Sequence, residues 1–290
     1  MWVAKRSTSI VVSASVDNDL LRNPPLLICP TLAVMFRDSR EKNLTMRKIF
    51  LGLFIVLIQV SGFSQSEDIT IKISDDLELI KISENAYIHV SYTISTKWGR
   101  VGANGLLLIY KKQAFLFDTP WTDKQTENLI SWIKDTMNVE IVGFIPNHWH
   151  EDCMGGLGYI HKQGIKSYAN QQTIDIAIIK DLPVPEFGFK DSLELKLGEK
   201  LIACYYLGAA HSMDNIVVWI PSEQILFTGC MVKNMRSRNL GNTADGDLIS
   251  YPMTLTKVMK KFPSAKIVIP GHGEYGGLEL IEHTLELTKN

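Results

Sequence analysis

Apolar and polar positions alternate in short runs from about residue 69 onward, with Gly, Pro, Asn and Asp between the runs. Leucine, β-branched and aromatic residues dominate the runs, which is typical of strands. The first five runs are Ile69–Ile73, Leu77–Ile82, Ala86–Thr93, Gly105–Tyr110 and Ala114–Asp118. Because only short connections separate them, we predict an antiparallel meander.

A helical pattern follows the meander. Thr122 or Asp123 can cap a helix that runs to about Met137. The apolar residues on one face of this helix are Leu129, Ile130, Ile133 and Met137. The apolar run Ile141–Ile145 then predicts a buried strand that ends before Pro146.

The second half of the chain repeats this alternation. A helix is predicted over Gln171–Lys180, and a second helix over Tyr251–Phe262. Between and after them we expect the strands Leu193–Leu197, Leu201–Leu207, Asn215–Ile220, Gln224–Phe227 and Lys266–Ile269, and a last helix from about Leu278. Strands followed by a helix, twice over, predict an α/β fold with two sheets packed face to face and helices outside.

Composition and charge narrow the class of protein. The chain has 290 residues, of which 46% are hydrophobic and 21% are charged, as in an ordinary globular protein. Residues 1–65 hold 8 basic and 4 acidic residues, and the remainder holds 22 basic and 27 acidic residues. A protein that binds a phosphate backbone needs a basic stripe, so we do not expect nucleic acid as a partner.

Residues 46–64 have the form of a secretory signal peptide. Two basic residues follow Met46, and the apolar run Ile49–Ile58 is about half of the roughly 20 residues that a membrane span needs. We expect cleavage near Ser64 and Gln65, a periplasmic or secreted domain over 65–290, and no stable membrane insertion after processing. Residues 1–45 are then interpreted as an upstream extension that is not part of the native protein; the alternative is an unusually long region ahead of the signal.

The cysteine count points to a metal site. The chain has Cys29, Cys153, Cys204 and Cys230, and the last three would remain after processing. An odd number cannot pair completely in an oxidising compartment. At least one thiol must therefore be free, reactive or bound to metal.

The segment from His148 to Cys153 carries three candidate ligands at alternate positions. His148, His150 and Asp152 come directly after a predicted strand and before Gly155 and Gly156. On an extended or looped backbone alternate side chains converge, so these three can face one metal ion. A helix would spread them, and we expect Pro146 and the glycine pair to disfavour a helix there.

Three further candidates stand at the ends of predicted strands. They are His211, Cys230 and His272, each preceded by a small residue. Loops on a rigid scaffold are common places for such sites, but taken alone each of the three could equally be structural. Cys153 is an alternative thiolate ligand to Cys230, and His89, His161 and His283 are interpreted as structural.

Taken together, these motifs resemble the class B metallo-β-lactamases of the first subclass. The resemblance covers about Asp76 to Thr288 and includes Gly241 and Asn242, Lys233 three positions after Cys230, and Trp98 and Gly99. Other hydrolases of that superfamily commonly place a His after the motif Asp and use a bridging carboxylate. Cys153 and Cys230 occupy those places here, which favours a lactamase.

The resemblance implies an αββα sandwich with two zinc ions. His148, His150 and His211 would hold one ion, and Asp152, Cys230 and His272 the other. A metal-bound hydroxide, oriented by Asp152, would attack the β-lactam ring of penicillins, cephalosporins or carbapenems and so confer resistance. Asn242 would stabilise the oxyanion, Lys233 would bind the substrate carboxylate, and Trp98 would lie in a flap over apolar groups. Asp118 would either support a ligand or only form a turn.

Two other functions remain open on the sequence alone. One is a hydrolase of thioesters or lactones from the same superfamily. The other is a non-catalytic zinc-binding protein, whose site would be closed to water. We expect the protein to be a monomer.

Overall fold

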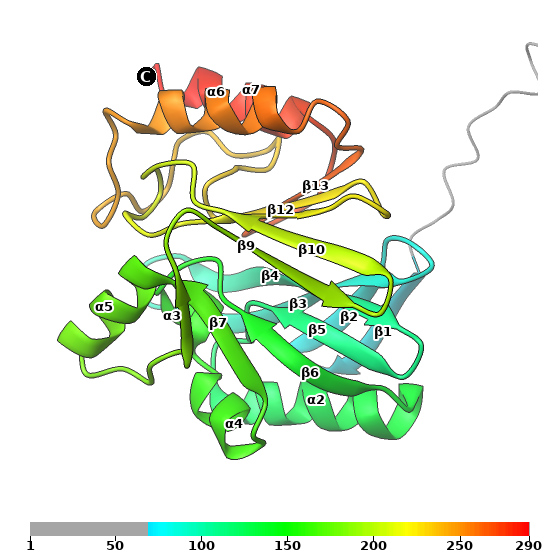
Figure 1. Cartoon of the computed structure of the whole chain (residues 1–290). Helices are drawn as coiled ribbons and strands as arrows, with labels where there is room; N and C mark the ends of the chain where they lie inside the picture. Colours follow the sequence, from blue (N-terminus) through cyan, green and yellow to red (C-terminus); the bar gives the residue numbers. More distant parts are fainter. Residues whose placement is uncertain (1–68, 290) are drawn as a thin grey trace, which may run out of the picture. The chain divides into compact units, whose positions relative to one another are not determined.

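Two stacked β-sheets form the centre of the computed structural model, which describes residues 69–289 (Figure 1). The first sheet has eight strands in sequence order. They are β1 (Ile69–Ser74), β2 (Leu77–Lys81), β3 (Ala86–Ser95), β4 (Gly99–Tyr110), β5 (Gln113–Phe117), β6 (Glu140–Ile145), β7 (Lys166–Asn170) and β8 (Phe187–Phe189). The pairs from β1 to β5 are antiparallel, which confirms the predicted meander, and β5 to β8 are parallel.

The second sheet has five strands in the order β13-β12-β11-β10-β9. They are β9 (Ser192–Leu197), β10 (Lys200–Tyr205), β11 (Val217–Ile220), β12 (Ile225–Gly229) and β13 (Ile267–Pro270). The pairs from β9 to β12 are antiparallel, and β13 joins β12 in parallel. Both sheets are therefore mixed.

Helices cover the outer faces of the two sheets, as Figure 1 shows. α2 (Asp123–Met137) and α4 (Leu157–Lys162) pack on the first sheet, and α6 (Tyr251–Lys261) and α7 (Glu279–Leu287) pack on the second. One apolar cluster fills the space between the sheets, and one lies under each helical layer. This arrangement confirms the expected αββα sandwich.

Local sequence explains α2, whose predicted bounds are confirmed. The Thr122 side chain accepts a hydrogen bond from the backbone N–H of Gln125 and so caps the first turn. Asn138 ends the helix in the left-handed conformation at φ 55°. Leu129 and Ile133 are fully buried against the first sheet, so the apolar face points as predicted.

Four elements were not predicted: β7, β8, α4 and α3 (Glu151–Met154). The expectation that residues 148–153 avoid a helix was wrong in part, since a helical turn begins at Glu151. Gly155 continues the helical hydrogen bonding, donating its N–H to Glu151 O. A Cβ on Gly155 would lie 2.0 Å from the carbonyl oxygen of Trp121, so this glycine permits close packing and does not break the helix.

The hairpin formed by β3 and β4 is longer than predicted. β4 begins at Gly99, six residues before the expected Gly105, because β3 and β4 pair as far as Ser95 and Gly99. This extension places Trp98 in the turn at the tip. Because the strands pair over this greater length, the hairpin tip reaches the end of the sandwich where the candidate site lies.

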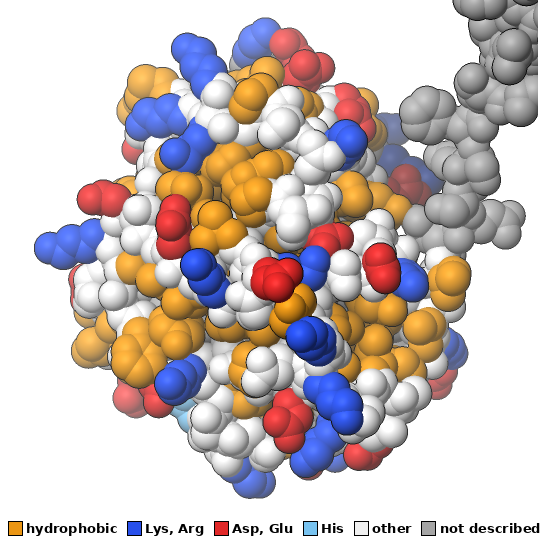
Figure 2. Space-filling model, turned by 45° about the vertical axis from the view of Figure 1, so that its right-hand side comes forward, with side chains coloured by type: hydrophobic (Ala, Val, Ile, Leu, Met, Phe, Trp, Pro, Cys, Tyr) orange, Lys and Arg blue, Asp and Glu red, His pale blue; other side chains and the backbone are white. Residues whose placement is uncertain are grey.

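The predicted upstream extension (1–45) and signal peptide (46–64) lie outside the described residues. Among residues 69–289, no helix is both long and apolar enough to cross a bilayer. On the face in Figure 2, basic and acidic side chains are interspersed with apolar areas. Neither sign of charge dominates that face.

Candidate metal centre

The structure brings all six predicted ligands together at one end of the sandwich. His148 and His150 lie in the loop after β6, and Asp152 lies in α3. The other three follow strands of the second sheet: His211 in the loop after β10, Cys230 directly after β12, and His272 after β13. Each sheet therefore contributes three of the six side chains.

Three histidines present ring nitrogens to a common point. His148 Nε2 lies 2.8 Å from His150 Nδ1, and His211 Nε2 lies 3.3 Å from the same Nδ1. Nitrogens bound to one tetrahedral zinc ion at about 2.0–2.1 Å are separated by about 3.3 Å. The distance between His211 and His150 matches that value, and the distance between His148 and His150 is shorter.

Burial keeps two of these imidazoles neutral, as metal ligands must be. Desolvation lowers the pKa of His148 to about 3 and lowers the pKa of His211 well below its usual value. A neutral ring offers a lone pair to a cation without first losing a proton. The buried position thus favours metal binding over protonation.

The second set of donors is equally compact. Asp152 Oδ2 lies 3.3 Å from Cys230 Sγ and 3.2 Å from His272 Nε2, and Cys230 Sγ lies 3.4 Å from His272 Nε2. Thiolate, imidazole and carboxylate together suit zinc better than magnesium or calcium. The chemistry of the donor set therefore fits the same metal.

The ionisation of Asp152, Cys230 and His272 favours the binding of a cation between them. Burial opposes ionisation of Asp152, but the hydrogen bond from His272 lowers its pKa strongly. The hydrogen bond from Cys153, opposed by burial, lowers the pKa of the Cys230 thiol. Burial likewise opposes the His272 imidazolium, yet the neighbouring thiolate and carboxylate raise its pKa well above the usual value. Two anions thus share one proton where a cation would bind.

Partners behind the rings orient several ligand atoms. The Gly102 carbonyl oxygen lies 2.8 Å from His272 Nδ1, so that nitrogen carries the proton and Nε2 faces the centre. Asp245 Oδ2 lies 3.1 Å from His150 Nε2, which leaves Nδ1 free in the same way. These contacts orient both rings so that the other nitrogen, His272 Nε2 or His150 Nδ1, faces the remaining donors and is the one that a metal ion would bind.

The two thiols that could serve as metal ligands have different neighbours. Cys230 Sγ lies beside both Asp152 and His272, whereas Cys153 Sγ lies 3.2 Å from His148 Nδ1 and 3.8 Å from Asp152 Oδ1. Cys153 therefore faces the nitrogen of His148 that points away from the other histidines. Burial raises the pKa of Cys153 well above its usual value. Cys204 lies apart, in the core between the sheets.

Asp118 forms a turn, and its carboxylate contacts the residue before a predicted ligand. It has φ 56°, a left-handed turn after β5. Its carboxylate accepts a hydrogen bond of 2.5 Å from the backbone N–H of Asn147, the residue before His148. Burial raises the pKa of Asp118, although this bond acts against the rise.

A cavity of about 900 Å³ opens over both donor sets. Its walls include all three residues predicted to bind substrate: Trp98, Lys233 and Asn242. Trp98 is 58% exposed at the hairpin tip, and Asn242 is also exposed, whereas Lys233 is buried. The site end of the sandwich therefore offers an open cleft, not a closed metal site.

Trp121, Trp149 and Asp245 also line this cavity, and sequence reasoning did not assign them to the site. Trp121 stacks on the His272 ring with centroids 6.5 Å apart. Its place after Thr119 and Pro120 resembles an ordinary turn, and no local pattern marks it. The three histidines interpreted as structural, His89, His161 and His283, bond to groups outside both donor sets.

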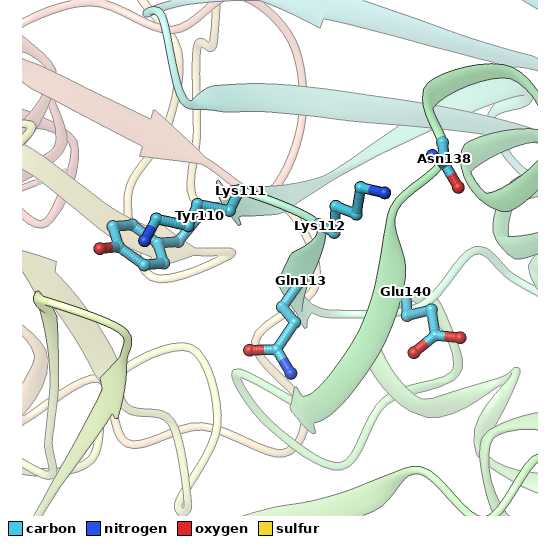
Figure 3. Close-up of a pocket in the computed structure, with 6 residues that line it drawn as sticks. All are labelled: Tyr110, Lys111, Lys112, Gln113, Asn138 and Glu140. Atoms are coloured by element: carbon cyan, nitrogen blue, oxygen red, sulfur yellow. The ribbon is translucent and has the colours of Figure 1, made fainter.

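A second cavity, of about 590 Å³, lies at the opposite end of β5. It is lined by Tyr110, Lys111, Lys112, Gln113, Asn138 and Glu140. Figure 3 shows these side chains pointing in different directions, not toward a common centre. None of the predicted site residues lies there.

Comparison with known proteins matches the part of the chain that carries the candidate site. A family model described as the metallo-beta-lactamase superfamily matches residues 98–272, which include all six donor residues. A metallo-beta-lactamase type 2 from Bacteroides fragilis is 49% identical over 242 residues, covering 83% of this chain and 96% of that protein. A protein of the same name from Pseudomonas aeruginosa is 33% identical, covering 73% of this chain and 84% of its own length.

A solved structure, the metallo-beta-lactamase from Pontibacter korlensis, superimposes with a TM-score of 0.72 at 36% identity. The match covers 74% of this chain and 99% of that one. The similarity therefore extends over 84–99% of the length of these three relatives.

Proposed function

Because this chain belongs to the metallo-β-lactamase superfamily, we propose that it hydrolyses β-lactams with two zinc ions held by the six converging side chains. The observation that carries the proposal is the pair of donor triads at one open cavity. Zinc, when bound, supplies Lewis acidity that makes water nucleophilic near neutral pH and polarises a carbonyl. The remaining steps fall to the residues of the chain.

Asp152 and Asn242 are proposed to act on the reacting atoms. The Asp152 carboxylate lies between the two thiols and next to His272, where it can orient the attacking water. Asn242 uses its Oδ1 to accept the N–H of Ala244 at 3.3 Å. Its amide N–H groups remain able to donate to the lactam oxygen as negative charge develops there.

Lys233 and Trp98 are proposed to bind the rest of the substrate. A β-lactam carries a carboxylate next to the ring nitrogen, and Lys233 is the basic side chain that lines this cavity. Trp98 presents an apolar ring above the opening and can cover apolar substituents. We expect penicillins, cephalosporins and carbapenems to be accepted.

The protein is further proposed to act outside the cytoplasm as a monomer. The signal-like pattern of residues 46–64 supports export, with cleavage near Ser64. Sequencing the N-terminus of the exported protein tests this. A mature chain that still carries residues 1–45 would contradict it.

An ultraviolet assay with a carbapenem, with and without a chelator, tests the proposed reaction. Activity should disappear on exhaustive chelation and return when zinc is added. A matched assay with a lactone and a thioester covers the competing hydrolase function. Turnover of those esters without turnover of any β-lactam would reject the proposal, and so would activity that survives metal removal.

A further inference from the structure

We propose that Asn147 is a positioning residue, which sets the tautomer of His148 and joins the two sheets behind the metal centre. The inference rests on the proposed zinc-dependent function. It concerns the residue directly before the first ligand, and Asn147 is 1% exposed.

Asn147 connects both sheets through its backbone and its side chain. Its N–H donates to Asp118, which follows β5 of the first sheet. Its carbonyl oxygen accepts from Ile216 N at 3.0 Å, and its Nδ2 donates to Ile216 O at 2.5 Å. Ile216 directly precedes β11 of the second sheet. Asn147 is therefore one of the links between the sheets at the end that carries the ligands.

The remaining polar atom of Asn147 faces the His148 ring. Asn147 Oδ1 lies 3.2 Å from His148 Nδ1. Since Nδ2 is already used by Ile216, the atom that faces the imidazole is an oxygen, which only accepts. Asn147 Oδ1 therefore favours a proton on Nδ1 of a neutral His148, the nitrogen that Cys153 Sγ also faces at 3.2 Å. Nε2, on the side of His150, then keeps its lone pair for a metal ion.

Asn147 also contacts the segment that carries Cys230. Gly229 directly precedes Cys230 and has φ +56°, and a Cβ on it would lie 2.4 Å from the Asn147 side chain. The absence of a side chain at Gly229 lets the Asn147 amide pack closely against this turn. Asn147 therefore adjoins one ligand of each donor set: it directly precedes His148, and it contacts Gly229, which precedes Cys230.

Two substitutions of similar shape separate positioning from packing. Asn147→Asp keeps an acceptor for His148 Nδ1 but loses the N–H that binds Ile216 O, so it should lower the melting temperature and retain near-native zinc affinity. Asn147→Leu removes both bonds, and zinc affinity should fall by about 10- to 100-fold. A role in packing alone predicts equal loss of stability and unchanged zinc affinity in both variants.

Asn170→Leu is the matched control. Asn170 is equally buried and donates to Lys190 O at 2.7 Å, but it lies at the start of α5 (Gln171–Ile179), outside the cavity lining. This variant should lower the melting temperature without changing zinc affinity. Zinc affinity is measured by competition with a chelating indicator, and the cobalt-substituted absorption spectrum reports ligand geometry.

One measurement needs no variant. A long-range proton–nitrogen NMR spectrum of the metal-free wild-type protein should show His148 protonated on Nδ1. Protonation on Nε2, or wild-type zinc affinity in Asn147→Leu, would overturn the proposal. These readouts do not use turnover, so a protein that binds zinc as expected but leaves β-lactams intact would reject only the proposed function.

Discussion

The Lys233 ammonium donates a hydrogen bond of 2.7 Å to the backbone carbonyl oxygen of Cys230. A side chain proposed to bind substrate is therefore fixed to the segment that carries a proposed metal ligand. Burial lowers the pKa of this ammonium, while the nearby Cys230 and Asp152 anions counteract the shift. The charge is thus held in place at the wall of the cavity before substrate arrives.

Substitution of Lys233 should act mainly on substrate binding. A charge-assisted contact is worth about 1.5–3 kcal/mol, so Lys233→Ala should lower kcat/KM by about ten- to a hundredfold, mainly through KM. Lys233→Arg should keep part of the activity, and zinc content should not change. Steady-state kinetics with parallel metal analysis measure this. Wild-type KM and kcat in the alanine variant would show that Lys233 does not bind substrate.

The thiols should differ sharply in their effect on metal content. Cys230→Ser should weaken the second zinc site and strongly reduce turnover, because a hydroxyl replaces thiolate poorly on zinc. Cys204→Ser serves as the control, since Cys204 lies in the core between the sheets and should affect stability alone. Metal stoichiometry of both variants, together with Cys153→Ser, is the measurement. Loss of zinc only in Cys153→Ser would show that the ligand assignment is wrong.

Trp98 should contribute to binding without contributing to stability. Its ring is mostly exposed at the tip of the β3–β4 hairpin, with Lys97 Nζ 4.7 Å from the ring centroid. Trp98→Ala should raise KM about three- to tenfold for substrates with large apolar substituents, which corresponds to about 0.6–1.4 kcal/mol. The melting temperature should stay the same. An equal change for a substrate without such a substituent would argue against an apolar contact.

Glu223, at the end of the sandwich away from the metal centre, should make the free energy of unfolding depend on pH. Its carboxylate accepts from Lys200 Nζ at 2.5 Å and from Ser83 Oγ at 2.6 Å, which links the turn after β2 to the second sheet. Although burial opposes ionisation, the hydrogen bond from Lys200 lowers the pKa of Glu223 below 4.5. The stabilisation is therefore present above about pH 4.5 and is lost as pH falls through the folded-state pKa.

Glu223→Gln should lower the free energy of unfolding at pH 7 by about 1–2 kcal/mol. Denaturant unfolding at several pH values measures this difference. The gap between variant and wild type should begin to narrow below pH 4.5 and should close once the wild-type carboxylate is protonated at its lower folded-state pKa. A gap that is constant across this range would mean that the charge of Glu223 contributes nothing.

Local sequence determined the elements whose stability depends on near neighbours. In α2, the apolar spacing from Leu129 to Ile133, the Thr122 cap and the left-handed Asn138 all lie within one short stretch. The first three candidate ligands could also be predicted, because His148, His150 and Asp152 are close in sequence. By contrast, the α3 turn was missed, since Gly155 reads as a helix breaker until its contact with Trp121 is known.

Only the tertiary structure decided which distant residues share one site. His211 lies 61 residues beyond His150, and Cys230 and His272 lie further along the chain. No periodicity in the sequence indicates that their loops meet the first histidine motif. The same is true of Asn147 and Ile216, which are 69 positions apart. The physical reason is that apolar packing, which brings the strand ends together when the sheets stack, can be satisfied by many sequences. Hydrogen bonds and metal ligands, by contrast, require particular atoms within about 3 Å of one another.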